Sequence, residues 1–354
     1  MKEKLLMKGN EAIGEGAIRA GCQAYFGYPI TPQTELLEYM SHRMPELGRI
    51  FIQAESEIAA INMCYGAAAA GARVMTSSSS PGISLKQEGI SYMAGAELPC
   101  VVVNVVRGGP GLGNVAPAQG DYFQATRGGG HGDYRTIVLA PASVQEAMDL
   151  TSLAFDLADR YRNPVMVLAD GLIGQTMEAV ELHHWKPKLV EKPWALTGAQ
   201  RRAKNVVKSI CLQPEVMEQH VQRLQEKYAR MRDEEVRYAE YLLDDAEVVL
   251  VAYGTSSRVC RSAVKLARAE GIAVGLFRPI SLFPFPYEQL GSVAQKANLL
   301  ISVELSAGQM IEDVRLAANG VAPVELISRL GGMVFSPEEV AEAVARLAGN
   351  SGRH

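Results

Sequence analysis

The chain lacks the features of several large protein classes. Its five cysteines are scattered and form no C-x-x-C pair, which supports neither a disulfide framework nor a zinc or iron–sulfur site. No run of Lys or Arg makes a basic patch, and the net charge of -4 argues against nucleic acid as a partner. No apolar run approaches the roughly 20 residues that cross a membrane, and the N-terminus lacks the apolar region of a signal peptide. We therefore expect a cytoplasmic protein that binds neither nucleic acid nor a membrane.

The composition and the alternation of apolar segments indicate an α/β protein. The 354 residues are 48% hydrophobic and 21% charged, which suits two domains of ordinary size. Over 1–182, helices alternate with strands that are apolar throughout, and this pattern predicts a doubly wound parallel sheet buried on both faces. A linker with a charged, solvated helix at 219–243 is expected over 183–245. Over 246–350 a second alternation predicts a smaller α/β domain.

The stretch YPITP follows the first apolar strand of the alternation. Pro29 and Pro32 exclude both a helix and a central strand, so the stretch is expected to be a rigid loop. Loops at the carboxyl ends of strands form the binding sites of open α/β sheets. The loop is therefore a candidate site.

Two glutamates, Glu55 and Glu57, begin the small-residue helix AESEIAAIN. A glutamate in a first helical turn commonly does no more than interact with the helix dipole. Residues two apart on a helix lie roughly 200° apart, however, so one of the two should face the packed side next to Ile58 and Ile61. A carboxylate in that position is suited to sharing a proton with a bound base.

Glycine-rich and serine-rich loops offer anion sites of low specificity. RGGPGLGN at 107–114 and RGGGHGD at 127–133 expose backbone amides, but neither opens a helix after the first strand as a dinucleotide-binding glycine motif does. Mobile turns are an equal interpretation. The loop TSSSSPG at 76–82 lies between a strand and a helix, where hydroxyls and amides either cap the helix or bind an anion.

Motifs spread along the chain form a distinctive combination. They are GYPITP (27–32), SEIAAINMCYGAAAAGAR (56–73), TSSSSPGISLKQEGISY (76–92), NVVRGGPGLG (104–113), FRPISLFPFP (277–286) and VELSAGQM (303–310). Together they resemble the alpha subunits of 2-oxoacid:ferredoxin oxidoreductases over nearly the whole chain. The serine-rich segment is most similar to that of the branched-chain type, which acts on 2-oxoisovalerate (3-methyl-2-oxobutanoate).

The resemblance implies a thiamine diphosphate enzyme assembled from several chains. This chain is similar to the domain that binds the pyrimidine, followed by a transketolase C-terminal-like domain. The Gly-Asp-Gly and downstream Asn that hold Mg²⁺ in the diphosphate-binding half are missing, since ADGLIG at 169–174 lacks the first glycine and the Asn. Mg²⁺ and the [4Fe–4S] centres are therefore expected in partners: a diphosphate-binding beta subunit, a gamma subunit and a ferredoxin-like delta subunit.

Site residues follow from the same resemblance. Glu57 corresponds to the catalytic glutamate that hydrogen-bonds N1′ of the aminopyrimidine, and Thr31 and Arg107 correspond to contacts of the substrate carboxylate. The alternative for Arg107 is a surface salt bridge. The residues expected to bind the cofactor are Tyr28, Pro29, Ile30, Glu57, Ser79 and Ser80.

The implied reaction is the oxidative decarboxylation of a 2-oxoacid with coenzyme A, giving acyl-CoA and CO₂ and passing electrons to ferredoxin. A member specific for 2-oxoglutarate or pyruvate is an alternative, as is a subunit of a non-oxidative 2-oxoacid decarboxylase, although the complete second domain counts against the latter. A non-catalytic scaffold subunit is an alternative of another class. The joint presence of Glu57, Thr31 and Arg107 counts against it.

Overall fold

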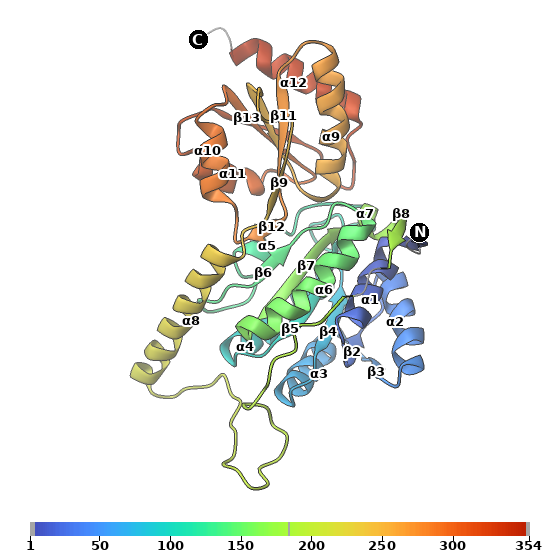
Figure 1. Ribbon diagram of the computed structural model, residues 1–354, viewed down its shortest axis with the longest axis vertical. Helices are drawn as coiled ribbons and strands as arrows, with labels where there is room; N and C mark the ends of the chain where they lie inside the picture. Colours follow the sequence, from blue (N-terminus) through green and yellow to red (C-terminus); the bar gives the residue numbers. More distant parts are fainter. Residues whose placement is uncertain (1–3, 183–184, 352–354) are drawn as a thin grey trace.

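The structure is a computed structural model that describes residues 4–182 and 185–351. Two α/β units follow each other along the long axis of the molecule (Figure 1). The first two residues of the predicted linker, 183 and 184, lie outside the described residues. The domain boundaries at 182 and 245 stay a prediction.

The larger sheet lies in the first unit. Its strand order is β12-β6-β7-β5-β4-β2-β3, and its strands from the first half of the chain are parallel to their neighbours. Strand β12 comes from the second half of the chain and pairs antiparallel with β6. The bounds are β2 (Ala24–Gly27), β3 (Ile50–Gln53), β4 (Val74–Ser78), β5 (Cys100–Val106), β6 (Ile137–Leu139), β7 (Pro164–Asp170) and β12 (Ser281–Phe283).

Helices cover both faces of this sheet. Helices α1, α2 and α6 pack together on one face, and α3 and α4 pack together on the other (Figure 1). Because β5 and β7 are buried at every residue, their apolar side chains face helices on both sides, as the sequence predicts for a doubly wound sheet. The bounds are α1 (Gly9–Arg19), α2 (Thr34–Glu46), α3 (Glu57–Ala69), α4 (Ser80–Gly95), α5 (Tyr122–Thr126), α6 (Val144–Tyr161) and α7 (Gly171–Gln175).

The second unit is a smaller sheet with the strand order β14-β13-β10-β11-β9. Only its edge strand β9 runs antiparallel to its neighbour, β11, among the strands described. Helices α9 and α12 pack together, as do α10 and α11. The bounds are β9 (Tyr238–Tyr241), β10 (Val248–Val251), β11 (Val274–Pro279), β13 (Leu299–Glu304), β14 (Val324–Ser328), α9 (Gly254–Ala269), α10 (Tyr287–Ala294), α11 (Met310–Ala318) and α12 (Pro337–Ser351).

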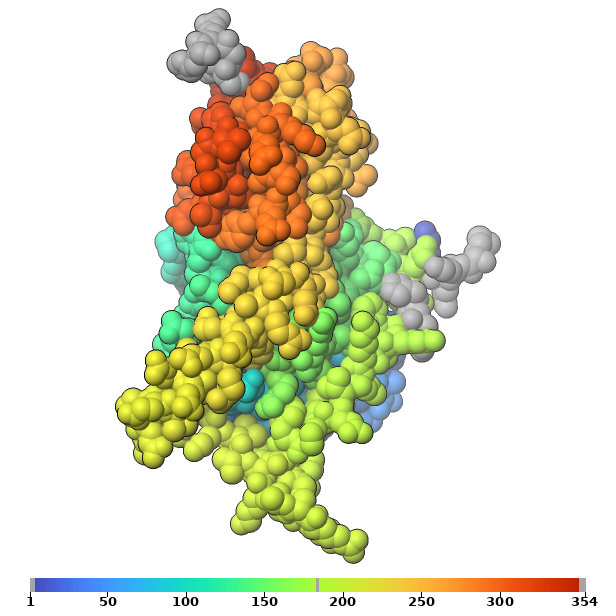
Figure 2. Space-filling model, turned by 60° about the vertical axis from the view of Figure 1, so that its left-hand side comes forward, coloured from blue at the N-terminus to red at the C-terminus, as the bar shows by residue number. Residues whose placement is uncertain are grey.

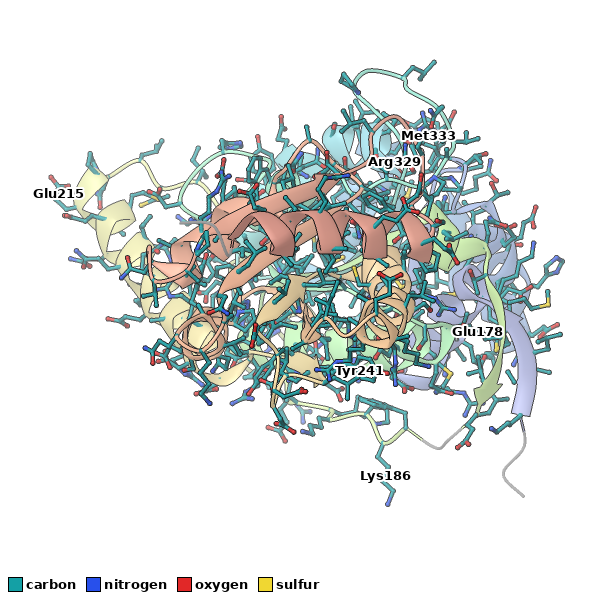
Figure 3. The ribbon with its side chains drawn as sticks, turned by 90° about the horizontal axis from the view of Figure 1, so that it is seen from above. Glu178, Lys186, Glu215, Tyr241, Arg329 and Met333 are labelled. Carbon is teal, nitrogen blue, oxygen red and sulfur yellow. The ribbon has the colours of Figure 1, made fainter. Side chains whose placement is uncertain are left out.

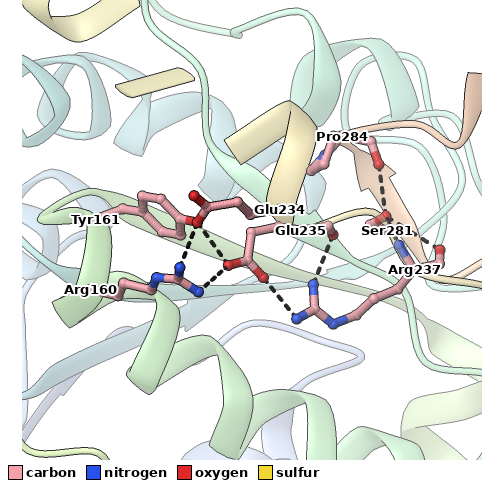
Figure 4. A network of polar contacts seen from close by, with 7 residues as sticks. All are labelled: Arg160, Tyr161, Glu234, Glu235, Arg237, Ser281 and Pro284. Carbon is pink, nitrogen blue, oxygen red and sulfur yellow. Dashed lines mark hydrogen bonds and ion pairs between the residues drawn. The ribbon is translucent and has the colours of Figure 1, made fainter. Parts of the chain in front are cut away.

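The charged helix predicted over 219–243 is α8 (Pro214–Glu234), which ends before β9. The prediction is wrong from residue 235 onward. The carboxylate of Glu235, which is 1% exposed, accepts hydrogen bonds from Tyr161 at 2.8 Å and Arg160 at 2.9 Å (Figure 4). The backbone N–H of Arg237 then donates to Ser281 Oγ at 2.8 Å. These contacts with distant residues override the local helix propensity.

A short pairing near the N-terminus was not expected from the sequence. Strand β1 (Lys4–Lys8) pairs antiparallel with β8 (Met177–Glu181). Glu178 of β8 accepts a hydrogen bond from Arg258 of the second unit at 2.7 Å. Figure 3 shows Glu178 on the side of the molecule opposite to Glu215, at the outer end of α8. Strand β8, which pairs with β1, thus also contacts the second unit through Glu178.

Buried polar side chains join the two units. Gln119 of the first unit accepts hydrogen bonds from Ser256 Oγ at 2.8 Å and from the backbone N–H of Leu305 at 3.0 Å. Asp170, at the end of β7, accepts one from the Thr255 hydroxyl at 2.6 Å. All five residues are buried, so the joint excludes water. The second unit is therefore fixed over the carboxyl end of β7 and the loop after β5.

The segment 185–213 forms no helix or strand in the described residues. It is held to the first unit by the backbone N–H of Leu196, which donates to Ala69 O at 2.8 Å, and by Trp194, whose ring lies 4.5 Å from the Arg162 guanidinium. Figure 2 shows this segment and α8 projecting from the lower part of the molecule. Of the helices in the described part of the chain, none is sufficiently long and apolar to span a membrane.

The contact between α1 and α6 depends on Gly16. A Cβ at this position would lie 2.3 Å from the backbone carbonyl oxygen of Met148 on α6. Gly16→Ala should therefore push the helices apart and lower the free energy of unfolding by about 1–3 kcal/mol, the usual cost of overpacking. Urea unfolding of the full chain measures this change.

Gly66 on α3 is the matched control. A Cβ there would meet no described atom within 4 Å, so Gly66→Ala should raise the free energy of unfolding by about 0.5–1 kcal/mol because alanine favours the helix. Equal effects of the two substitutions would contradict the close packing at Gly16.

Candidate functional site

The loops after β2, β4 and β5 meet at one edge of the larger sheet. These strands are neighbours and run parallel, so their carboxyl ends lie side by side, the usual position of a site in such sheets. The predicted residues that the structure brings to this edge are Tyr28, Pro29, Ile30, Thr31, Ser79, Ser80 and Arg107. Glu57 reaches the same edge from the first turn of α3.

Glu57 is the buried member of the glutamate pair. Its exposed fraction is 6%, whereas Glu55 is exposed. Ile61 is buried beside the sheet as predicted, but Ile58 is 52% exposed, so the expectation that Ile58 faces the packed side is wrong. Ser56 caps the N-terminus of α3, since its hydroxyl accepts a hydrogen bond from the Ala59 N–H at 3.2 Å. This cap turns Ile58 outward and Glu57 inward.

The carboxylate of Glu57 lies against Gly82 of α4. A Cβ at Gly82 would stand 2.4 Å from Glu57 Oε1 and 2.0 Å from Ser78 Oγ, so only glycine lets the helix approach these groups. The Ser78 hydroxyl is buried and has no hydrogen-bond partner in the described part of the chain. The site therefore combines a buried carboxylate with a hydroxyl that is free to bind.

The two predicted serines have different surroundings. Ser79 occupies the N-cap position of α4, but its hydroxyl makes no capping bond and is buried without a partner among the described residues. Helix capping by the Ser79 side chain, the alternative left open by the sequence, is therefore not observed. The Ser80 hydroxyl accepts a hydrogen bond from the backbone N–H of Arg107 at 3.1 Å, and so connects the loops after β4 and β5.

Gln33, which the sequence analysis missed, fixes the proline loop. Its side-chain amide donates to the backbone carbonyl of Tyr28 at 3.2 Å, and its Oε1 accepts from the Ser77 hydroxyl at 2.6 Å. The Tyr25 hydroxyl lies 2.5 Å from the same Ser77 oxygen. The loop is thus attached to the end of β4, while Thr31 at its tip is exposed.

Arg107 is buried, with an exposed fraction of 8%. Its Nη1 donates to the backbone carbonyl of Thr31 at 3.0 Å and its Nη2 to that of Leu112 at 3.0 Å. Its Nε has no partner among the described residues. Arg107 is therefore not the surface salt bridge of the alternative interpretation; its guanidinium joins the loop that carries Thr31 to the loop after β5.

Lys86 was also missed by the sequence analysis. It is fully buried on α4, and its ammonium donates to Thr76 Oγ1 at 2.8 Å and to the Ser77 carbonyl at 3.0 Å. Burial lowers the pKa of Lys86 from 10.5 to about 8, although the nearby Cys64 and Glu57 oppose this shift. Its helical spacing from Gly82 and Ile90 in the sequence is the signal that places it on the buried face.

The remaining polar motifs lie outside this site. Asp170 of ADGLIG accepts hydrogen bonds from the N–H groups of Leu172 and Ile173 at 3.1 Å as well as from Thr255, and burial raises its pKa. It caps α7 and joins the units. In the second glycine cluster, the His131 carbonyl accepts from Ser91 on a late turn of α4 at 2.6 Å, away from the edge of the sheet.

Comparison with known families identifies the chain. The family model described as "Pyruvate flavodoxin/ferredoxin oxidoreductase, thiamine diP-bdg" matches residues 15–241, and "Pyruvate:ferredoxin oxidoreductase core domain II" matches residues 246–340. The chain belongs to this family. The resemblance seen in the sequence is confirmed, and so are the α/β fold class and the assignment as an oxidoreductase subunit with a thiamine diphosphate-binding domain.

Similar proteins cover nearly the whole chain. The ketoisovalerate oxidoreductase subunit VorB of Methanothermobacter thermautotrophicus is 57% identical over 350 residues, which are 98% of each chain. The 2-oxoglutarate synthase subunit KorA of Methanocaldococcus jannaschii is 38% identical over 369 residues, covering 96% of this chain and 98% of that subunit.

Solved structures share the fold. A 2-oxoglutarate:ferredoxin oxidoreductase from Magnetococcus marinus, with 2-oxoglutarate, coenzyme A and succinyl-CoA bound, has a TM-score of 0.87 at 27% identity. The alignment covers 98% of this chain and 65% of that one. An inactive tetramer of a split-gene transketolase has a TM-score of 0.56 at 13% identity, and the alignment covers 96% of this chain and 97% of the transketolase chain. This similarity shows a shared fold alone.

The site fits the polar edge of an aminopyrimidine. Such a ring presents both donors and acceptors, and a buried carboxylate is a suitable partner for a protonated ring nitrogen. The Glu57 carboxylate, the space left at Gly82 and the unpartnered hydroxyls of Ser78 and Ser79 supply this set of contacts. In the described residues, no group of three or more His, Cys, Asp or Glu side chains could hold a metal ion.

Proposed function

We propose that this chain is the pyrimidine-binding subunit of a complex that oxidises a branched 2-oxoacid, 2-oxoisovalerate, with coenzyme A. The products are the branched acyl-CoA and CO₂, and ferredoxin takes the electrons. The observation that carries the proposal is the buried Glu57 carboxylate against Gly82 in a chain whose family model names thiamine diphosphate. The 57% identity to a ketoisovalerate oxidoreductase subunit, against 38% to a 2-oxoglutarate synthase subunit, supports the branched substrate.

Glu57 has the central role in this proposal. Bound thiamine diphosphate supplies a nucleophilic carbon for the keto group of the substrate and an electron sink once CO₂ leaves. The Glu57 carboxylate hydrogen-bonds N1′ of the aminopyrimidine and holds a proton there, as a general acid–base partner does. Burial at the start of α3 keeps water from competing for that hydrogen bond.

The neighbouring loops position the cofactor and the substrate. Tyr28, Pro29 and Ile30 in the loop after β2, and Ser79 and Ser80 after β4, would hold the cofactor. The exposed hydroxyl of Thr31 contacts the carboxylate of the 2-oxoacid. Arg107 contributes positive charge at the same place, and its bond to the Thr31 carbonyl holds that hydroxyl in position.

Partner subunits complete the active site. The chain lacks the Gly-Asp-Gly motif and any cysteine cluster, which supports placing Mg²⁺ and the diphosphate contacts in a beta subunit. The [4Fe–4S] centres belong to the partner subunits, which are the beta, gamma and ferredoxin-like delta subunits. A 2-oxoglutarate or pyruvate substrate, a non-oxidative decarboxylase and a scaffold remain the alternatives that the experiments below distinguish.

Replacing Glu57 tests the central role directly. Glu57→Gln in the complete complex should lower kcat by about 10²- to 10⁴-fold, because a neutral amide cannot exchange the proton at N1′. Viologen reduction driven by the 2-oxoacid at saturating cofactor measures the effect. Glu55→Gln is the control and should stay close to wild type, since Glu55 is exposed. A Glu57 variant with more than about a tenth of wild-type activity would contradict the assignment.

The subunit purified alone tests the placement of the missing groups. We expect a colourless protein that reduces no viologen and binds thiamine diphosphate weakly in calorimetry, because the diphosphate contacts and electron carriers are in other chains. Tight binding by the isolated chain, or absorption from an iron–sulfur centre, would show that the placement is wrong.

A panel of 2-oxoacids tests the substrate. The complete complex should have a higher kcat/KM for 2-oxoisovalerate than for 2-oxoglutarate or pyruvate, as the similarity to VorB indicates. A preference for 2-oxoglutarate would favour the alternative substrate. CO₂ release without reduction of an electron acceptor would favour the non-oxidative decarboxylase, and no turnover of any 2-oxoacid would favour the scaffold.

A further inference from the structure

The proline loop, residues 28–32, is held in place through its backbone carbonyls. Two of its five residues are prolines and have no N–H group, so most of its backbone polar groups are acceptors. The carbonyls of Tyr28, Thr31 and Pro32 each accept a hydrogen bond from a side chain outside the loop. Side-chain donors therefore fix the backbone on both sides of Thr31, the proposed contact of the substrate.

Asn10 holds the side of the loop that leads into α2. It lies at the start of α1 and is 0% exposed. Its Nδ2 donates to the Pro32 carbonyl at 2.8 Å and to Glu35 Oε2 at 2.9 Å, so both hydrogens of the amide are used. The exposed Gln175 donates a longer bond, at 3.2 Å, to the same carbonyl. The buried amide is thus the shorter of the two attachments.

Gln33 holds the side of the loop that follows β2. It precedes the first residue of α2 and is 0% exposed. Its amide donates to the Tyr28 carbonyl at 3.2 Å, and its Oε1 accepts from the Ser77 hydroxyl at 2.6 Å. Ser77 stands next to Ser78, whose unpartnered hydroxyl belongs to the proposed cofactor site. Gln33 therefore attaches the loop to the strand end beside the cofactor.

We infer that Asn10 and Gln33 are positioning residues, which fix the loop on both sides of Thr31 and so set the affinity of the complex for its 2-oxoacid. The inference rests on the proposed contact between the Thr31 hydroxyl and the substrate carboxylate. Because Thr31 is exposed, little packing orients its side chain, and the direction of its hydroxyl depends on the backbone that carries it. The two buried amides determine the position of that backbone.

The chemistry of the substrate decides which kinetic constant depends on this contact. The carboxylate loses its charge as it leaves as CO₂, so a contact with it stabilises the bound substrate more than the transition state. A displaced Thr31 should therefore raise KM and leave kcat nearly unchanged. This pattern differs from that of Glu57→Gln, for which kcat is expected to fall.

Two substitutions of similar shape remove the donors. In the complete complex, Asn10→Leu and Gln33→Met should each raise KM for 2-oxoisovalerate about tenfold or more and change kcat by less than about threefold, because small displacements of a positioned group weaken binding strongly. Viologen reduction over a range of 2-oxoacid concentrations, at saturating thiamine diphosphate, Mg²⁺ and coenzyme A, measures both constants. Since the two residues hold different carbonyls, either variant tests the inference if the other fails to fold.

Asn163 provides the matched control. Like Asn10, it is 0% exposed and has a buried Oδ1 without a partner in the described part of the chain. Its Nδ2 also donates to two acceptors, the carbonyls of Arg135 at 2.9 Å and Pro164 at 3.0 Å. It precedes β7, at the end of the strand opposite to the site. Asn163→Leu should destabilise the full chain in urea as Asn10→Leu does, but leave KM at the wild-type value.

Four outcomes would overturn the inference. Equal increases of KM in Asn10→Leu and Asn163→Leu would show a general effect of destabilisation. An increase in only one of Asn10→Leu and Gln33→Met, both folded, would show that the loop need not be held on both sides. Wild-type KM in both, with a raised KM in Thr31→Val, would exclude the positioning role and leave the proposed substrate contact standing. Wild-type KM in Thr31→Val would remove that contact and the inference together, while kcat of Glu57→Gln tests the remaining function separately.

Discussion

The contact between the Glu57 carboxylate and the backbone of Gly82 is the constraint on which the site depends. A Cβ at Gly82 would lie within 2.4 Å of the carboxylate, so the separation of α3 and α4 is set by a residue without a side chain. With the helices this close, Glu57 is buried. The hydroxyls of Ser78 and Ser79 are buried as well, and they have no hydrogen-bond partner in the described part of the chain. Close helix packing thus creates both the shielded acid and the free polar groups beside it.

The second unit shapes the same edge from the other side. Asn114, in the loop after β5, donates to the Gly331 carbonyl of the second unit at 2.9 Å, and Gln119 binds across the buried joint. The loop after β5 is therefore held at both ends, by Arg107 near β5 and by the second unit farther along. The second unit therefore helps to fix one of the loops that form the site.

The sequence predicts the fold well where local pattern and tertiary packing agree. Apolar runs between helices identified the buried strands, and the spacing of Glu55 and Glu57 identified one inward carboxylate. The local sequence pattern fails where contacts with distant residues determine the backbone conformation. Glu235 lies outside the helix predicted for it because its carboxylate binds Arg160 and Tyr161. Helix α11 was not predicted, and it begins at amides bound by the buried Glu304 carboxylate.

The site was predicted in part for the same reasons. The family resemblance named Thr31, Ser79 and Arg107, and the structure brings them to one edge because parallel neighbouring strands end together. Pairwise contacts between side chains distant in sequence, such as those of Gln33 with Ser77 and Lys86 with Thr76, leave no local pattern and were missed. The hydrogen bonds from Arg107 to backbone carbonyls could not be predicted either, since a sequence does not show which acceptors surround a guanidinium.

Strand β12 has a consequence for the order in which the chain can fold during synthesis. It completes the larger sheet by pairing with β6, yet it lies more than a hundred residues later in the chain. Until residues 281–283 leave the ribosome, β6 presents an open strand edge, the kind of surface that pairs with other chains. The nascent protein therefore passes through a period in which its first sheet is assembled but unprotected, and this period ends only when much of the second unit has been made.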